Sequence, residues 1–408
     1  MPTAEAPVAH DLDLARMRGD RQARLRSEME RRGVDAMILT GTGNVHYATG
    51  ARWVASEVGL AVLEPAVAVV TRDGPPHLFT AHLDGVPPEL PRDHVHDMVM
   101  PEFDEGAARL AGFVADLTGG GDVCLAVDEL STALHVGLPR LLPRATVASA
   151  GEVLGAAKIC KTADEIECIR RAQRINELAM YDVYDALRPG LRQSDLTALF
   201  LRRIFELGAT ANSIDPIWQA TPRAIAHGPW TVHGDVAFPT STTDRILRED
   251  DLILNDTGIL YEGYASDFGR TWWPGRRRPR PHERDQLARW RAVVDRVLAA
   301  VEPGATGLDL TRAAREGEPG RKPWLDHFYL IHGLGTESAE MPLIGTDLGE
   351  QFDEGIVLAP GMVLVLEPVI WDDGQGGYRG EDIVAVTEDG YRMLSDFPYM
   401  PFDDGDDR

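Results

Sequence analysis

The sequence is poor in cysteine, in long apolar runs and in positive charge. It holds 3 cysteines in 408 residues, and none of them stands in a C-x-x-C pair, so a disulfide framework is not expected. No stretch reaches the roughly 18 uninterrupted apolar residues that a membrane helix needs. The N-terminus also lacks the basic start and apolar run of a secretory signal. We therefore expect a reduced, cytoplasmic protein without a membrane partner.

The shortage of basic residues has its own consequence. The 41 lysines and arginines stand against 65 aspartates and glutamates, and the formal net charge is -24. Such a surface repels phosphate backbones, so we expect no nucleic-acid partner. Part of the acidity belongs to the tail at 402–408, which is typical of a solvated end. Acidic residues gathered in a pocket would instead indicate cation binding.

The length and an apolar fraction of 44% predict two folded domains. Strand-like runs alternate with helical patterns in the first part, which predicts an α/β domain over residues 1–157. The second domain, 158–408, is expected to open with a helix over 161–188, where Thr162 and Glu165 form a capping box. The strand-like runs of the two domains lie at 36–40, 59–63, 67–70, 123–127, 252–256, 362–367 and 383–387.

Carboxylates stand at the ends of the later strands, where apolar or β-branched residues are usual. Period-two alternation puts Leu254 and Asp256 on one strand face, and the Asp-Thr-Gly run at 256–258 is expected to open a turn. The returning arm would then carry Asp267 close to Asp256. Two ionised carboxylates held close repel each other, so a divalent cation between them is expected.

Three further residues extend this set. Glu367 ends one strand-like run, Glu381 precedes another, and His332 lies in a glycine-rich segment at 330–335. We expect the flanking glycines to leave room for the imidazole. Taken singly, these residues are equally typical of turns, strand caps and buried histidines. Together, one imidazole and four carboxylates favour a site for Mn, Fe, Co or Zn rather than Ca.

This combination resembles the metallopeptidases of the pita-bread fold, which include aminopeptidase P, prolidase, methionine aminopeptidase and the non-peptidase creatinase. The matching elements are Asp-x-Gly and Ser-Asp-x-x-Arg-Thr within 256–271, His-Gly-x-Gly at 332–335, Glu-Pro at 367–368, Glu-Asp at 381–382 and Lys-Thr-x-x-Glu-Ile at 161–166. The resemblance implies a creatinase-type N-terminal domain, 1–157, followed by a pita-bread catalytic domain, 158–408. It also implies two divalent transition-metal ions held by Asp256, Asp267, His332, Glu367 and Glu381, and a homodimer.

Two substrate histidines of these peptidases have no evident counterpart. In the Glu-x-His-Glu-x-Pro element, Ala339 occupies the place of the histidine between Glu337 and Glu340. The upstream histidine would fall at Pro239, and His233 lies six residues earlier. Two interpretations of His233 stay open. It is either a loop residue or a substrate-contacting residue carried back by an insertion.

Local segments at 270–273 and 387–391 resemble a different member of the fold, the dimethylsulfoniopropionate lyase. Three functions therefore stay open. The first is a metal-dependent hydrolase of an amide or Xaa-Pro bond in a short peptide, with Glu367 as ligand and general base. The second is a lyase acting on a small zwitterionic metabolite, with Glu337 or Glu340 as the base. The third is a non-catalytic binding protein, which the intact set of metal ligands disfavours.

Overall fold

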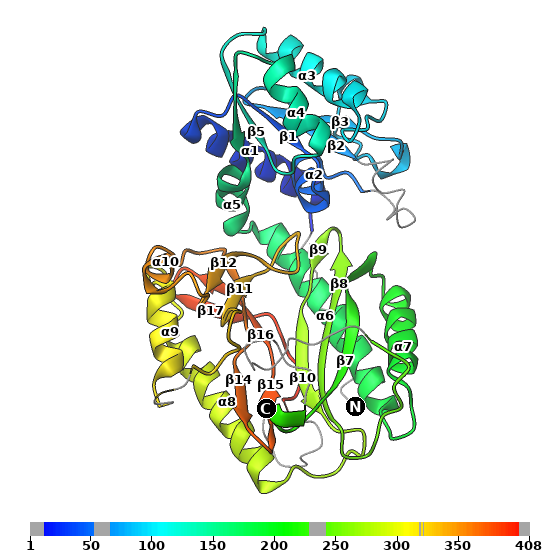
Figure 1. Cartoon of the computed structure of the whole chain (residues 1–408), viewed down its shortest axis with the longest axis vertical. Coiled ribbons are helices and arrows are strands. Elements are labelled where there is room, and N and C mark those ends of the chain that lie inside the picture. The colour runs from blue at the N-terminus through cyan, green and yellow to red at the C-terminus, as the bar shows by residue number, and fades with distance from the viewer. Residues whose placement is uncertain (1–11, 53–65, 228–241, 318–319, 321, 400–408) are drawn as a thin grey trace. The chain divides into compact units, whose positions relative to one another are not determined.

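The computed structural model describes residues 12–52, 66–227, 242–317, 320 and 322–399 (Figure 1). The chain divides into two compact units, Met1–Lys158 and Ile159–Arg408. The strand expected at 59–63 and the candidate His233 lie outside the described residues. Among the helices that are described, none is both long enough and apolar enough to span a bilayer.

The first unit is built on one mixed sheet. Its strands are β1 (Ala36–Leu39), β2 (Val67–Thr71), β3 (His77–Phe79), β4 (Val95–His96), β5 (Val123–Val127) and β6 (Ala145–Ser149). Its helices are α1 (Leu14–Arg32), α2 (Thr42–Thr49), η1 (Leu83–Gly85), η2 (Arg92–His94), α3 (Asp104–Thr118), α4 (Thr132–Leu141) and α5 (Gly151–Ile159).

The strand order of this sheet is β4-β3-β2-β1-β5-β6. Successive side chains of a strand point to opposite faces, and the core is split accordingly. Met37 and Leu39 join the cluster under α1, α2 and α5, whereas Ile38 joins the cluster under α3 and α4. The expected α/β organisation and the strands expected at 36–40, 67–70 and 123–127 are confirmed.

The described part of the second unit holds two larger sheets and a short ribbon. Its strands are β7 (Ala211–Thr221), β8 (Leu252–Tyr261), β9 (Tyr264–Ala265), β10 (Phe268–Trp272), β11 (Ile331–Gly333), β12 (Glu340–Ile344), β13 (Val363–Leu366), β14 (Val369–Asp372), β15 (Gly376–Arg379), β16 (Asp382–Thr387) and β17 (Gly390–Met393). Its helices are α6 (Ala163–Ala186), α7 (Gln193–Glu206), η3 (Ile225–His227), α8 (Pro281–Ala299), α9 (Gly307–Arg315) and α10 (Glu350–Glu354).

One sheet runs β10-β8-β7, with β9 beside β8, and the other runs β12-β11-β13-β16-β17. Helices α6 and α7 lie along the first sheet, and α8 and α9 lie on the side of the second (Figure 1). The capping box expected at the start of α6 is confirmed, because Thr162 and Glu165 each bond the backbone N–H of the other.

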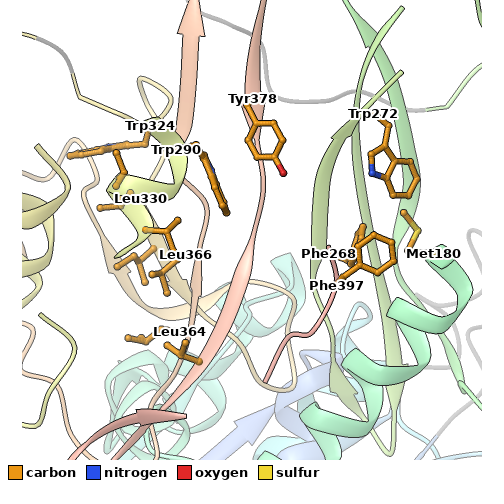
Figure 2. Close-up of a cluster of buried hydrophobic side chains, with 14 of the residues drawn as sticks. Met180, Phe268, Trp272, Trp290, Trp324, Leu330, Leu364, Leu366, Tyr378 and Phe397 are labelled. Carbon is orange, nitrogen blue, oxygen red and sulfur yellow. The ribbon is translucent and has the colours of Figure 1, made fainter. Parts of the chain in front are cut away.

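Apolar side chains of both sheets gather on the helix sides. Phe268 and Trp272 of β10 lie near Met180 of α6, and Leu366 of β13 lies near Trp290 of α8 (Figure 2). Because strand side chains alternate, the residues directly before and after each of these apolar positions in the strand point to the opposite face of the sheet. Those inner faces carry the polar residues of the candidate site.

The turn expected at 256–258 is wrong, because β8 continues without interruption to Tyr261. The chain reverses instead at Glu262 and Gly263, whose φ angles are 52° and 79°. Positive φ at both central residues is what a two-residue type I′ hairpin turn requires. Glycine at position 258 allows β7 to pair closely with β8, because a Cβ there would collide with the Ser213 hydroxyl of β7.

Candidate metal centre

The hairpin of β8 and β10 brings Asp256 and Asp267 together. Asp256 pairs in register with Gly269, and Asp267 directly precedes β10. Their residues are only 3% and 8% exposed. Asp256, Asp267 and Glu381 offer oxygen atoms that all lie within 4.8 Å of one another, which is the spacing of ligands around a metal ion. Gly269 makes this approach possible, because a Cβ there would lie 2.5 Å from Oε1 of Glu381.

His332 presents one ring nitrogen to this cluster. It lies on β11, and its Nδ1 is 2.9 Å from the carbonyl oxygen of Gly333. Since Nδ1–H donates to that carbonyl, the lone pair is on Nε2, which is 3.2 Å from Oδ2 of Asp267 and 3.6 Å from Oε1 of Glu367. Burial lowers the pKa of His332. A neutral imidazole anchored by a backbone carbonyl is the usual form of a metal-binding histidine.

The glycines that follow His332 allow the next strand of the sheet to approach closely. A Cβ on Gly333 would collide with the carbonyl oxygen of Met341, and a Cβ on Gly335 would collide with the carboxylate of Glu340. These two glycines therefore make room for β12 and for Glu340, which no local sequence pattern reveals as their neighbours.

Arg379 stands among the carboxylates, and the sequence reasoning missed it. Its Nη2 lies 3.0 Å from Oδ2 of Asp256 and 2.9 Å from Oε2 of Glu367, and it also contacts Glu381. Arg379 is 2% exposed. The available signal was its place two residues before Glu381, because residues i and i+2 of an extended chain face the same side.

The negative charge of the cluster exceeds what this arginine neutralises. The guanidinium contacts Asp256, Glu367 and Glu381, and Asp267 adds a fourth carboxylate beside Asp256 and Glu381. Burial raises the pKa of Glu367 to about 7. Burial, followed by the charges of Asp256 and Glu367, raises the pKa of Asp267 well above its usual value. Burial also raises the pKa of Glu381, against the opposing charge of Arg379.

Two carboxylate oxygens of the cluster are also buried without a hydrogen-bond donor in the described part of the chain. They are Oδ1 of Asp256 and Oε2 of Glu381. Leaving a buried acceptor unsatisfied is costly. Divalent cations would supply both the missing charge and the missing contacts. Carboxylate and imidazole donors suit transition metals, so the residues present fit a metal centre.

Two predicted catalytic glutamates lie on the strand and loop after His332. Glu340 is buried, and its Oε1 lies 2.7 Å from Nζ of the buried Lys161. Its charge is therefore balanced by an ammonium group. Glu337 is exposed, as is Ala339.

A second residue that the sequence reasoning missed is Tyr329. Its ring centroid lies 5.0 Å from that of His332. Burial, followed by the charges of Glu367 and Asp267, raises the pKa of Tyr329 above its usual value. The phenol therefore stays protonated and keeps a hydrogen-bond donor beside the cluster. No sequence signal marked it, because its importance depends on the position of His332.

A buried set of carboxylates and one imidazole, held on the inner faces of two sheets, defines a metal-dependent enzyme of the pita-bread fold. Residues 167–388 match the family model described as Metallopeptidase family M24. Residues 21–157 match the Creatinase/Prolidase N-terminal domain. The chain therefore belongs to metallopeptidase family M24, a family of hydrolases. The expected family and fold are confirmed.

Named relatives agree with this assignment. The Xaa-Pro dipeptidase of Pyrococcus furiosus is 32% identical over 247 residues, which are 60% of this chain and 65% of that protein. The probable dipeptidase PepE of Mycobacterium bovis is 30% identical over 298 residues, 71% of this chain and 72% of that protein. The solved prolidase from Pyrococcus furiosus aligns with a TM-score of 0.69 at 26% identity, covering 91% of this chain and 99% of that chain.

Proposed function

We propose that this protein is a dinuclear metal-dependent peptidase that cleaves the amide bond before proline in short peptides. The ligands in this proposal are Asp256, Asp267, His332, Glu367 and Glu381. The observation that carries it is the buried excess of carboxylate over the single guanidinium of Arg379. The names of the relatives, an Xaa-Pro dipeptidase and a prolidase, supply the substrate class.

The residues of the chain have distinct roles in this proposal. Bound divalent ions would supply Lewis acidity toward the peptide carbonyl and would acidify a water molecule. Glu367 is both a ligand and the general base that accepts the proton of that water. Arg379 contacts Asp256, Glu367 and Glu381 and balances part of their negative charge. Tyr329 offers a hydrogen-bond donor at the edge of the centre.

The experiment is metal analysis coupled to turnover. Protein purified without chelator should hold close to two transition-metal equivalents, and after loading with Mn, Co or Zn it should hydrolyse Xaa-Pro dipeptides. Asp267→Ala should lose both properties. Asp353→Asn is the matched control, because Asp353 is also buried but bonds the backbone N–H of Gly345 instead. A wild-type protein that binds no metal after reconstitution would contradict the proposal.

A lyase that acts on a small zwitterionic metabolite is the second candidate. The observation that favours it is Ala339, which cannot donate the hydrogen bond of the histidine that the resembled peptidases carry there. Because Glu340 is paired with Lys161, Glu337 would be the base in this candidate function. A metal-loaded protein that is inert toward Xaa-Pro dipeptides but turns over a betaine-like compound would decide for the lyase.

A further inference from the structure

The buried face of α6 carries amide side chains directly behind the β8–β10 hairpin. Asn176 and Gln173 are 0% and 1% exposed. Residues three apart share one side of a helix, and their neighbours on that side, such as Ala172 and Ala179, belong to the apolar core. A buried amide is costly unless its hydrogen bonds are made. The groups to which these amides bond therefore reveal their role.

Asn176 bonds both arms of the hairpin at once. Its Nδ2 donates to the carbonyl oxygen of Thr257 at 2.8 Å and to Oγ of Ser266 at 3.0 Å. Its Oδ1 accepts from Oγ1 of Thr257 at 2.9 Å. Thr257 directly follows Asp256, and Ser266 directly precedes Asp267. One side chain therefore links Thr257, which follows Asp256, to the hydroxyl of Ser266, which precedes Asp267.

Gln173 adds a contact at the second aspartate. Its Oε1 accepts from the backbone N–H of Asp267 at 3.3 Å. Its Nε2 donates to Oε1 of Glu177 at 3.3 Å, and that same oxygen accepts from the backbone N–H of Asp396 at 2.6 Å. The hydrogen bond to Glu177 thus fixes the amide group of Gln173 and keeps its Oε1 directed at the backbone N–H of Asp267.

We propose that Asn176, assisted by Gln173, is a positioning residue that fixes the separation of Asp256 and Asp267 and thereby sets the metal affinity of the centre. This inference rests on the ligand set proposed above. The β8–β10 ladder holds the two strands together, but the two carboxylates at its end repel each other. The hydrogen bonds of Asn176 to Thr257 and Ser266 restrain the chain next to each aspartate against this repulsion. Ligands must be held to about 0.5 Å for productive geometry, and loss of supporting hydrogen bonds typically costs about 10–100-fold in metal affinity.

The alternative is that Asn176 only stabilises the fold, and a matched control separates the two roles. Gln193 is another buried amide of the second unit, which bonds the carbonyl of Trp218 and accepts from Oγ1 of Thr243 at 2.7 Å. Its side-chain hydrogen bonds within the described part of the chain go to Trp218 and Thr243, neither of which is next to a proposed ligand. Asn176→Ala and Gln193→Ala both remove buried amide hydrogen bonds, but only the first removes a link between the two aspartates.

The test is titration of the metal-free full-length variants with Mn or Zn by calorimetry, together with urea unfolding and amide hydrogen exchange over 257–267. Asn176→Ala should bind metal about 10–100-fold more weakly than wild type and should exchange faster over this segment. Gln193→Ala should lose stability but keep the wild-type metal affinity. Gln173→Ala, which frees one arm only, should show a smaller loss of affinity and serves if Asn176→Ala does not fold.

Unchanged metal affinity in the folded variants would overturn the inference and leave the proposed function intact. An equal loss of affinity in Gln193→Ala would also overturn it, because the effect would then follow stability in general. A wild-type protein without any metal binding would overturn the ligand set, and the positioning role with it.

Discussion

Replacing Arg379 with methionine tests how the buried centre balances its charge. Methionine keeps an unbranched stem of similar shape and removes the guanidinium that contacts Asp256, Glu367 and Glu381. Removing one partner of a buried ion pair costs about 3–5 kcal/mol, because the remaining charge is left uncompensated. We therefore expect the unfolding free energy of metal-free Arg379→Met to fall by about that amount near neutral pH.

The assay is urea unfolding with and without saturating Mn or Zn. Binding to the native state stabilises it by an amount that grows with the affinity. Metal ions supply the positive charge that the variant has lost, so the metal-induced gain in unfolding free energy should be larger in Arg379→Met than in wild type. The metal-induced gain of Arg379→Lys should lie between those of wild type and Arg379→Met, because an ammonium keeps the charge but lacks the planar guanidinium that bonds several carboxylates.

Arg21→Met provides the control for the loss of a buried arginine. Arg21 is fully buried in the first unit, so its loss should reduce stability without any dependence on metal. Equal unfolding free energies of wild type and Arg379→Met in the absence of metal would refute the charge argument. A gain from metal that is no larger in Arg379→Met than in wild type would refute it as well.

Three other substitutions address separate features. Burial raises the pKa of Glu177 to about 7 from 4.5. Its protonated form therefore stabilises the fold below about pH 4.5, and this contribution is lost as pH rises through 7. The free energy of unfolding of Glu177→Gln should thus rise relative to that of wild type over this pH range, by roughly 3 kcal/mol at pH 8. Parallel curves of unfolding free energy against pH would contradict this. Ala339→His should raise Xaa-Pro turnover by about 10²–10³ by restoring a hydrogen-bond donor; an unchanged kcat/KM would show that another group already supplies it. His332→Ala should abolish turnover but keep cooperative unfolding, and wild-type metal content in this variant would contradict the ligand set.

The sequence allowed the core strands and the faces of the ligand-bearing segments to be predicted, because alternation is a local property. In the run that includes Val365 and Glu367, every second residue points inward, and the structure follows this pattern. The turn at 256–258 was mispredicted for the opposite reason. Asp-x-Gly is a typical turn signal, but the backbone of Gly258 pairs with Ile214 on β7, a partner that no local pattern reveals.

Arg379 was missed because its partners come together only in the folded protein. β15 carries it next to β10, where the backbone of Arg379 exchanges hydrogen bonds with the Thr271 hydroxyl at 2.8 and 2.9 Å. Asp256 lies more than a hundred positions away in the chain and meets Arg379 through that pairing. The local signal, its place two residues before Glu381, does not reveal a partner so distant in sequence.

The apolar core of the second unit also determines the register of the candidate metal centre. Leu364 and Leu366 of β13 belong to the apolar core on the helix side (Figure 2). Val365, which pairs with His332, points to the opposite, inner side because strand side chains alternate. A one-residue slip would reverse every side chain of the strand. It would turn Glu367 away from Arg379 and place leucines against buried charges. Burial of the leucines therefore opposes the slip, so the packing that stabilises the sheet also holds this carboxylate toward the centre.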